Sequence, residues 1–132
     1  MNISTVARET GISAKTIRYY ESIGLTPQPD RQPNGYRAYG KDDVATLRFV
    51  QRARRLGFSL DEVRTLLTLW RDQRRASADV KRLALDHIQE INARIASLQS
   101  IKRTLVDLTE RCHGNNRPDC PILDDLARLG YG

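Results

Sequence analysis

The sequence has no long apolar run and no recognisable leader. Its 132 residues are 39% hydrophobic and 29% charged, and no stretch approaches the roughly 18 consecutive apolar residues of a transmembrane helix. Residues 1–8 also lack the basic and apolar regions of a secretory signal peptide. We therefore expect a cytoplasmic protein with no membrane association.

Cysteine and histidine are scarce, with two of each in the chain. Two histidines without a recognisable nucleophile–base set or acid pair argue against an enzyme, so we expect no catalytic residues. In a cytoplasmic protein a permanent disulfide is not expected, and paired cysteines more often bind a metal or respond to oxidation. Cys112 and Cys120 are therefore the first candidates for a functional site.

Acidic residues do not balance the basic ones, and the imbalance is local. The net charge is +6; residues 1–75 hold 14 Lys/Arg against 8 Asp/Glu, whereas residues 76–132 hold 8 of each. A basic N-terminal half favours a polyanionic partner, of which nucleic acid is the first candidate. The alternative is that the charge serves solubility alone.

Two short helices separated by a glycine turn are predicted at the N-terminus. Asn2 or Ser4 can cap a first helix that runs to about residue 9, and Thr10-Gly11 breaks it. Ser13 can cap a second helix over residues 14–23, which Gly24 ends. This spacing is typical of a helix-turn-helix.

The second helix has two different faces. Ala14, Ile17 and one of the two tyrosines follow core spacing. Positions i, i+3, i+4 and i+7 share the opposite face, and they are occupied by Lys15, Arg18, Tyr19 and Ser22. That face can enter a major groove, with Arg18 reading guanine and the others contacting phosphate or sugar. An ordinary solvated face is the alternative.

Residues 26–40 are rich in proline, glycine and glutamine. Asn34-Gly35 is a strong hairpin signal, and Arg31 precedes it. The residues that follow are aromatic or basic, at Tyr36, Arg37 and Tyr39. A basic, aromatic hairpin beside a helix-turn-helix is typical of a wing that contacts the DNA backbone, although the segment taken alone is compatible with a surface loop.

Two further helices complete a predicted winged helix-turn-helix domain over residues 1–70. The first spans residues 41–56 and ends at Gly57, with cations at Arg48, Arg52, Arg54 and Arg55. Ser59-Leu60-Asp61-Glu62 is a capping box that opens the second, whose inward face is Val63, Leu66, Leu67 and Trp70. Residues 71–79 are polar without an apolar stripe, so we interpret them as a linker.

A long helix is predicted over residues 80–111. Apolar residues recur there at steps of three or four, namely Ala84, Ile88, Ile91, Ile95, Leu98, Ile101, Leu105 and Leu108. This is a coiled-coil seam, and nothing else in the chain is long enough to cover it. We expect an antiparallel homodimer, which brings each N-terminal domain beside the other subunit's cysteine loop. Packing of the helix back onto its own N-terminal domain is the alternative.

The last segment, residues 112–132, is expected to form a metal-binding loop and a short helix. Seven residues separate Cys112 from Cys120, and Pro121 suits the first position of a helix. Two thiolates fit a soft d¹⁰ ion of low coordination number such as Cu(I), whereas Zn(II) prefers four ligands. His113 is the one further donor nearby, and its position next to a ligand in sequence gives it poor geometry for the same ion.

Several motifs together resemble the MerR family of transcription regulators. They are Ile3-Ser4-Thr5-Val6-Ala7, Thr16-Ile17-Arg18-Tyr19-Tyr20-Glu21, Gly24-Leu25, Asn34-Gly35-Tyr36-Arg37-Ala38-Tyr39 and Ala53-Arg54-Arg55-Leu56-Gly57-Phe58-Ser59-Leu60. The resemblance covers essentially the whole chain. The spacing of the cysteines, Cys120-Pro121-Ile122-Leu123 and Ser77-Ala78-Asp79-Val80-Lys81 are similar to the copper-responsive branch of that family.

The resemblance implies a metal site with Cys112 and Cys120 as ligands to one monovalent ion per subunit. Cu(I), Ag(I) and Au(I) all suit two thiolates. Relatives that sense divalent ions usually carry cysteine where this chain has Ser77, which the resemblance places over the partner's metal loop; the alternative is a helix cap. Lys81 is our candidate to offset the net negative charge of Cu(I) with two thiolates, and an exposed lysine is the alternative.

The resemblance also implies a function. A homodimer would bind a palindromic operator in double-stranded promoter DNA and, with metal bound, distort that DNA so that RNA polymerase activates copper-efflux and detoxification genes. The DNA-contacting residues expected are Lys15, Arg18, Tyr19, Tyr36, Arg37 and Arg54. The alternatives are a thiol-based redox-sensing regulator, a sensor of a divalent metal, and an architectural DNA-bending protein without a ligand.

Overall fold

The computed structural model describes residues 1–29, 33 and 38–128, and this part of the chain is helical without strands. The helices are α1 (Ile3–Thr10), α2 (Ala14–Ser22), α3 (Lys41–Arg55), α4 (Leu60–Arg71), α5 (Ser77–Arg111) and α6 (Pro121–Leu126). The expected mainly α fold is therefore confirmed. Arg31 and the centre of the predicted hairpin, residues 34–37, lie outside the described residues. The chain divides into two compact units, Met1–Lys81 and Arg82–Gly132.

The helix-turn-helix forms through the expected caps. The Asn2 carboxamide oxygen accepts from the Thr5 amide at 2.9 Å, and the Ser13 hydroxyl accepts from the Thr16 amide at 3.1 Å. Between the two helices Gly11 has a φ of +73°, and a Cβ there would lie 3.2 Å from Gln51 Nε2. The turn therefore favours glycine for its backbone conformation, and a Cβ at this position would also displace the end of the Gln51 side chain slightly.

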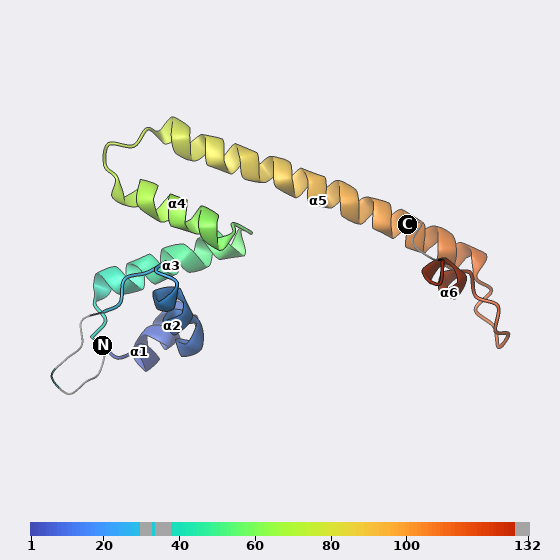
Figure 1. Cartoon of the computed structure of the whole chain (residues 1–132), viewed down its shortest axis with the longest axis horizontal. Coiled ribbons are helices and arrows are strands. Elements are labelled where there is room, and N and C mark those ends of the chain that lie inside the picture. Colours follow the sequence, from blue (N-terminus) through green and yellow to red (C-terminus); the bar gives the residue numbers. More distant parts are fainter. Residues whose placement is uncertain (30–32, 34–37, 129–132) are drawn as a thin grey trace. The chain divides into compact units, whose positions relative to one another are not determined.

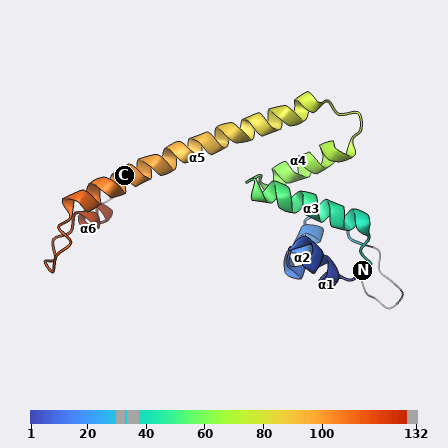
Figure 2. The ribbon, with the colours of Figure 1, turned by 180° about the vertical axis from the view of Figure 1, so that it is seen from behind.

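Helix α3 is the centre of the N-terminal unit. In Figures 1 and 2, α1 and α2 lie against one side of α3 and α4 lies on the other. The side chains that are almost fully buried come from all four helices, at Val6, Ile17, Val50 and Val63. Burying such side chains stabilises the unit by roughly 1.5–3 kcal/mol each, so this core fixes the orientation of α2.

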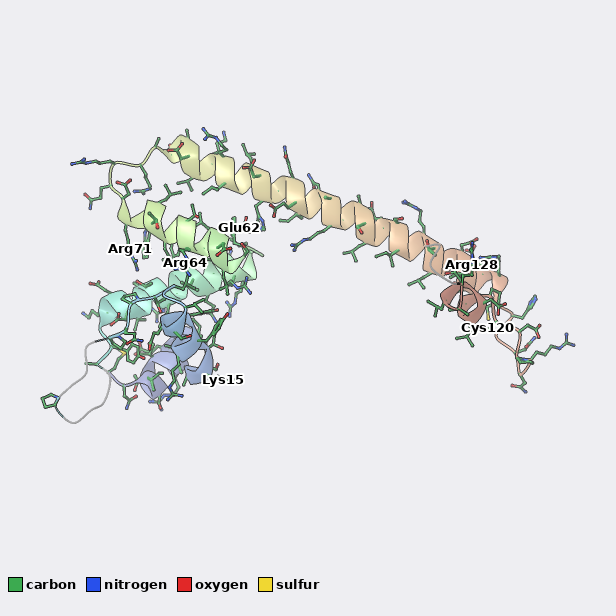
Figure 3. The ribbon with its side chains drawn as sticks, viewed as in Figure 1. Lys15, Glu62, Arg64, Arg71, Cys120 and Arg128 are labelled. Atoms are coloured by element: carbon green, nitrogen blue, oxygen red, sulfur yellow. The ribbon has the colours of Figure 1, made fainter. Side chains whose placement is uncertain are left out.

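Helix α4 begins with the predicted capping box and is tied to its neighbours by two arginines (Figure 3). The Ser59 hydroxyl accepts from the Glu62 amide at 3.1 Å, and the Glu62 carboxylate accepts from the Ser59 amide at 2.8 Å. Arg71 donates to the Thr46 hydroxyl of α3 at 3.3 Å. Arg64 donates to the carbonyls of Ile23 and Gly24, just after α2, at 3.0 Å each.

Tyr39 belongs to the core and not to a DNA-facing surface. Its side chain is 5% exposed, its hydroxyl donates to the Glu21 carboxylate at 2.7 Å, and its amide donates to the Met1 carbonyl at 2.9 Å. The prediction that grouped Tyr39 with the wing aromatics was wrong, because sequence proximity to Asn34-Gly35 says nothing about which side of the backbone a residue faces.

Helix α5 begins at Ser77, three residues before its expected start at Val80, so the segment between α4 and α5 is only residues 72–76. Its 35 residues extend over about 53 Å at 1.5 Å per residue. Much of the predicted seam is exposed in the single chain, including Ile95 (47%), Leu98 (65%) and Ile101 (53%), whereas Leu108 is buried. Among the described residues no helix is both long and apolar enough to cross a membrane.

The contact between Tyr39 and buried Glu21 can be tested by mutation. Tyr39→Phe removes a hydrogen bond to a buried carboxylate, which should lower the free energy of unfolding by about 1.5–3 kcal/mol. Urea unfolding followed by circular dichroism measures it. The matched control is Tyr19→Phe, because Tyr19 is 51% exposed and its hydroxyl should matter by less than about 0.5 kcal/mol. Equal stability of the two variants would contradict the assignment.

Candidate functional site

The surface face of α2 has the composition and exposure expected of a DNA-contacting helix. Lys15, Arg18 and Tyr19 are exposed, and Figure 3 labels Lys15 at the outer edge of the α1–α2 pair. Tyr20 is the buried tyrosine, at 9% exposure, so the ambiguity between the two tyrosines is resolved. The face carries two cations and a phenol that are free to meet a polyanion, although their contact with DNA stays a prediction.

Arg54, the expected phosphate contact, also has an internal partner. Its guanidinium donates to the Phe58 carbonyl at 2.8 Å, which satisfies a carbonyl just beyond the end of α3. The same side chain lines a cleft of about 380 Å³ beside the helix-turn-helix turn, together with Ser13, Thr16 and Arg55. Substitution of Arg54 should therefore affect local structure as well as any phosphate contact.

The two remaining DNA-contact predictions, Tyr36 and Arg37, lie outside the described residues. The base of that segment is described at Tyr39, which is held by Met1 and Glu21. Tyr39 is therefore anchored beside α2. The prediction for Tyr36 and Arg37 stays open.

Both cysteines lie at helix ends. Cys112 directly follows the last residue of α5, and Cys120 directly precedes α6 with Pro121 in its first turn (Figure 3). The Cys112 amide donates to the Thr109 carbonyl at 3.3 Å, and the Cys120 carbonyl accepts from the Asp124 amide at 3.0 Å. Both thiols are free and half-buried. The backbone of each cysteine is therefore anchored at a helix terminus.

The loop between the cysteines is exposed from His113 to Asp119. Gly114 has a φ of +62°, and an Asx turn is formed where the Asn115 side-chain oxygen accepts from the Arg117 amide at 2.9 Å. Turns of this kind let the chain reverse with few long-range contacts. The loop can therefore change conformation without disturbing a core.

The donor set fits a soft metal ion. The only cysteines of the chain are the two at the ends of this loop, and each is partly shielded from water without being sealed off. Thiolates of this kind favour soft ions such as Cu(I) over hard ions such as Mg(II). His113 is exposed, and nothing in the described geometry adds it to the site.

Ser77 and Lys81, the predicted outer residues of the metal site, are both exposed in the first turns of α5. They line a cleft of about 440 Å³ whose apolar wall includes Phe49 and Trp70. These two rings stack with centroids 4.5 Å apart, and Trp70 is 43% exposed. The prediction that Trp70 faces inward was wrong, because the core is already filled by Val63 and Leu67 and the indole packs at the edge instead.

Comparison with known families identifies the class of protein. The family described as "MerR HTH family regulatory protein" matches residues 1–69, and the family described as "MerR, DNA binding" matches residues 44–108. The chain therefore belongs to the MerR family: it is a DNA-binding transcription regulator with a helix-turn-helix. The family resemblance predicted from the motifs is confirmed.

The chain is similar to individual regulators over nearly its full length. It is 52% identical over 130 residues to the transcriptional regulator HmrR of Sinorhizobium medicae, covering 98% of this chain and 88% of that protein. It is 45% identical over 127 residues to CueR of Salmonella typhimurium, covering 96% and 92%. The crystal structure of PbrR691 from Ralstonia metallidurans in complex with lead(II) superposes with a TM-score of 0.83 at 31% identity, covering 96% and 99%.

From the exposed face of α2 we predict that operator binding depends on Arg18. Arg18→Ala should weaken specific binding by about 1–3 kcal/mol and relax base preference at one operator position, if the guanidinium makes a bidentate contact with guanine. Fluorescence anisotropy against operators changed one base pair at a time measures both effects. Arg103→Ala, which removes an exposed cation from α5, is the control. Unchanged affinity and preference in Arg18→Ala would mean that another element reads the bases.

Proposed function

We propose that this chain is a cytoplasmic, homodimeric, metal-responsive transcription activator, and not an enzyme. In our proposal Cys112 and Cys120 bind one Cu(I) ion per subunit, with Ag(I) or Au(I) as chemical substitutes. The single observation that carries the proposal is the pair of free, half-buried thiols held at the end of α5 and the start of α6 in a chain of the MerR family.

The choice of Cu(I) rests on coordination chemistry and on relatives. Two thiolates suffice for a soft d¹⁰ ion, whereas Zn(II) would need two further ligands. The similarity to CueR and HmrR supports the same choice, as do the cysteine spacing and the copper-branch motifs at residues 120–123 and 77–81. Expected targets are copper-efflux and detoxification genes.

A divalent ion is the second candidate, and one observation favours it. PbrR691, whose structure superposes on 96% of this chain, is described in complex with lead(II). Relatives that sense divalent ions usually carry a third cysteine at the position of Ser77. Since this chain has a hydroxyl there, we rank a divalent ion below Cu(I).

Charge compensation gives Lys81 its proposed role. Cu(I) with two thiolates carries a net negative charge, which is costly to bury without a compensating cation. In the antiparallel dimer that we propose, the first turns of α5 lie near the partner's metal loop, where Lys81 would supply a positive charge and Ser77 a neutral hydroxyl.

The homodimer is supported by the apolar seam of α5. Residues at seam positions, among them Ile88 (50% exposed), Ile95 (47%) and Leu105 (49%), are exposed in the single chain. An apolar stripe repeated over nearly four heptads is stable in water only when another helix covers it. A second copy supplies a stripe of the same length, and two-fold symmetry suits a palindromic operator.

The proposed mechanism converts a local change at the loop into a change in DNA shape. When metal is bound, residues 112–120 become ordered and α6 is repositioned against the dimer. The coiled coil then shifts, the two DNA-binding domains approach one another, and the operator bends and untwists. Because deformation energy depends on DNA sequence, part of the promoter specificity comes from bases that α2 does not touch. RNA polymerase then engages realigned promoter elements.

If the two thiols are the metal ligands, their removal should affect activation of transcription and leave operator binding unchanged. Cys112→Ser and Cys120→Ser should each abolish activation by Cu(I) while leaving operator affinity within about twofold, because the substitutions lie outside the N-terminal unit that contacts DNA. Run-off transcription and anisotropy on the same preparations measure the two properties. Full activation of either variant by Cu(I) would exclude that cysteine as a ligand.

The seam predicts a concentration-dependent loss of the dimer. Ile95→Asp places a charge in a dry interface at a cost of several kcal/mol, enough to favour monomers at micromolar concentration. Analytical ultracentrifugation measures the change. Ala93→Asp adds the same charge on the opposite side of α5 and should leave the dimer intact. If Ile95→Asp stays dimeric, the stripe is covered by something other than a second α5.

A further inference from the structure

The C-terminal end of the helix that faces DNA is completed by a residue from another helix. The last turn of α2 contains no basic residue, and the chain then turns through Gly24, which has a φ of +71°. The final carbonyls of a helix have no partners within the helix and carry its partial negative charge. The carbonyls of Tyr19, Tyr20 and Glu21 already accept from amides of the following turn, so the carbonyls that remain for a donor from another helix are those of Ile23 and Gly24, just beyond α2.

Arg64 of α4 supplies both hydrogen-bond donors and a positive charge at this point. Its Nη1 donates to the Gly24 carbonyl and its Nη2 to the Ile23 carbonyl, each at 3.0 Å. Two adjacent nitrogens of one planar guanidinium thus bind two consecutive carbonyls. This geometry restricts orientation in a way that a single donor cannot, and the positive charge opposes the negative end of the helix dipole.

The position of these bonds matters because of what lies on either side. Arg18 and Tyr19 are on the last two turns of α2 and are exposed. Arg64 is on α4, which the short segment 72–76 joins to α5. The contact therefore ties the helix that faces DNA to the helix that leads toward the dimerisation and sensing half of the chain.

We propose that Arg64 is a positioning residue for operator recognition. It touches no DNA in this proposal; it holds the C-terminal end of α2 at α4 so that the exposed side chains of α2 meet base edges in a fixed register. The proposal rests on the proposed role of α2 as the base-reading helix. Loss of Arg64 leaves the core intact but lets the end of α2 move, which weakens specific binding more than binding to random DNA.

The test compares Arg64→Ala with Arg71→Ala in the full chain. Both remove an arginine of α4, but Arg71 donates to Thr46 of α3 and makes no described contact with α2. Amide hydrogen exchange of residues 22–26 in the free protein should be faster in Arg64→Ala and unchanged in Arg71→Ala. The ratio of operator to random-DNA affinity should fall roughly threefold to thirtyfold in Arg64→Ala only.

Two conservative variants of Arg64 allow the proposal to be tested even if Arg64→Ala does not fold. Arg64→Lys retains the charge with a single flexible donor group, and should recover part of the affinity ratio; Arg64→Gln retains a donor without the charge and should recover less. Circular dichroism verifies folding. If Arg64→Ala is unfolded, the operator-to-random affinity ratios of Arg64→Lys and Arg64→Gln test the proposal instead, and the lysine variant should have the higher ratio. Wild-type exchange at residues 22–26, or a wild-type affinity ratio in a folded Arg64→Ala protein, overturns the proposal.

Failure of the proposed function can be distinguished from failure of this inference. If α2 does not read bases, Arg18→Ala will leave base preference unchanged, and exchange at residues 22–26 will still respond to Arg64→Ala. If only the inference is wrong, Arg18→Ala will relax base preference while Arg64→Ala will not alter the affinity ratio. All binding measurements use metal-free protein, so the identity of the metal does not enter.

Discussion

The burial of apolar side chains around α3 is the interaction on which the rest of the N-terminal unit depends. Val6, Ile17 and Val63 reach this core from α1, α2 and α4, and each fixes which face of its helix remains outside. Because Ile17 and Tyr20 point inward, Arg18 and Tyr19 must point outward. The exposed face that we propose to contact DNA is thus a consequence of core packing, and Arg64 adds hydrogen bonds to the two carbonyls just after α2.

The capping bonds, the Arg64 hydrogen bonds and the proposed metal ligands of this protein all lie at helix ends. Polar side chains cap α1, α2 and α4 in the ordinary way, whereas the carbonyls beyond α2 depend on Arg64 from another helix. The proposed metal ligands follow the same logic, since Cys112 and Cys120 border α5 and α6. A ligand joining two helix ends can change their relative geometry, which a ligand on a helix face cannot do as directly.

Local signals predicted much of this fold, and non-local contacts account for the errors. The caps at Ser13 and Ser59 were predicted because capping depends on residues three positions apart. Tyr39 and Trp70 were misplaced because their environments are set by Glu21 and Phe49, which lie 18 and 21 positions away in sequence. The partner of Arg64, 40 residues distant, leaves no periodic signal. The cysteine pair was evident from residue type alone, but sequence could not show that both thiols are half-buried.

The central claim is that a soft monovalent ion held by Cys112 and Cys120 activates transcription from DNA to which the dimer is already bound. Multi-round transcription by RNA polymerase from the cognate promoter, across buffered free Cu(I), Ag(I) and Zn(II) under reducing conditions, tests it most directly. The account predicts activation by Cu(I) and Ag(I) and none by Zn(II), with operator occupancy constant throughout. Activation by Zn(II) alone, or by an oxidant in the absence of metal, would contradict it.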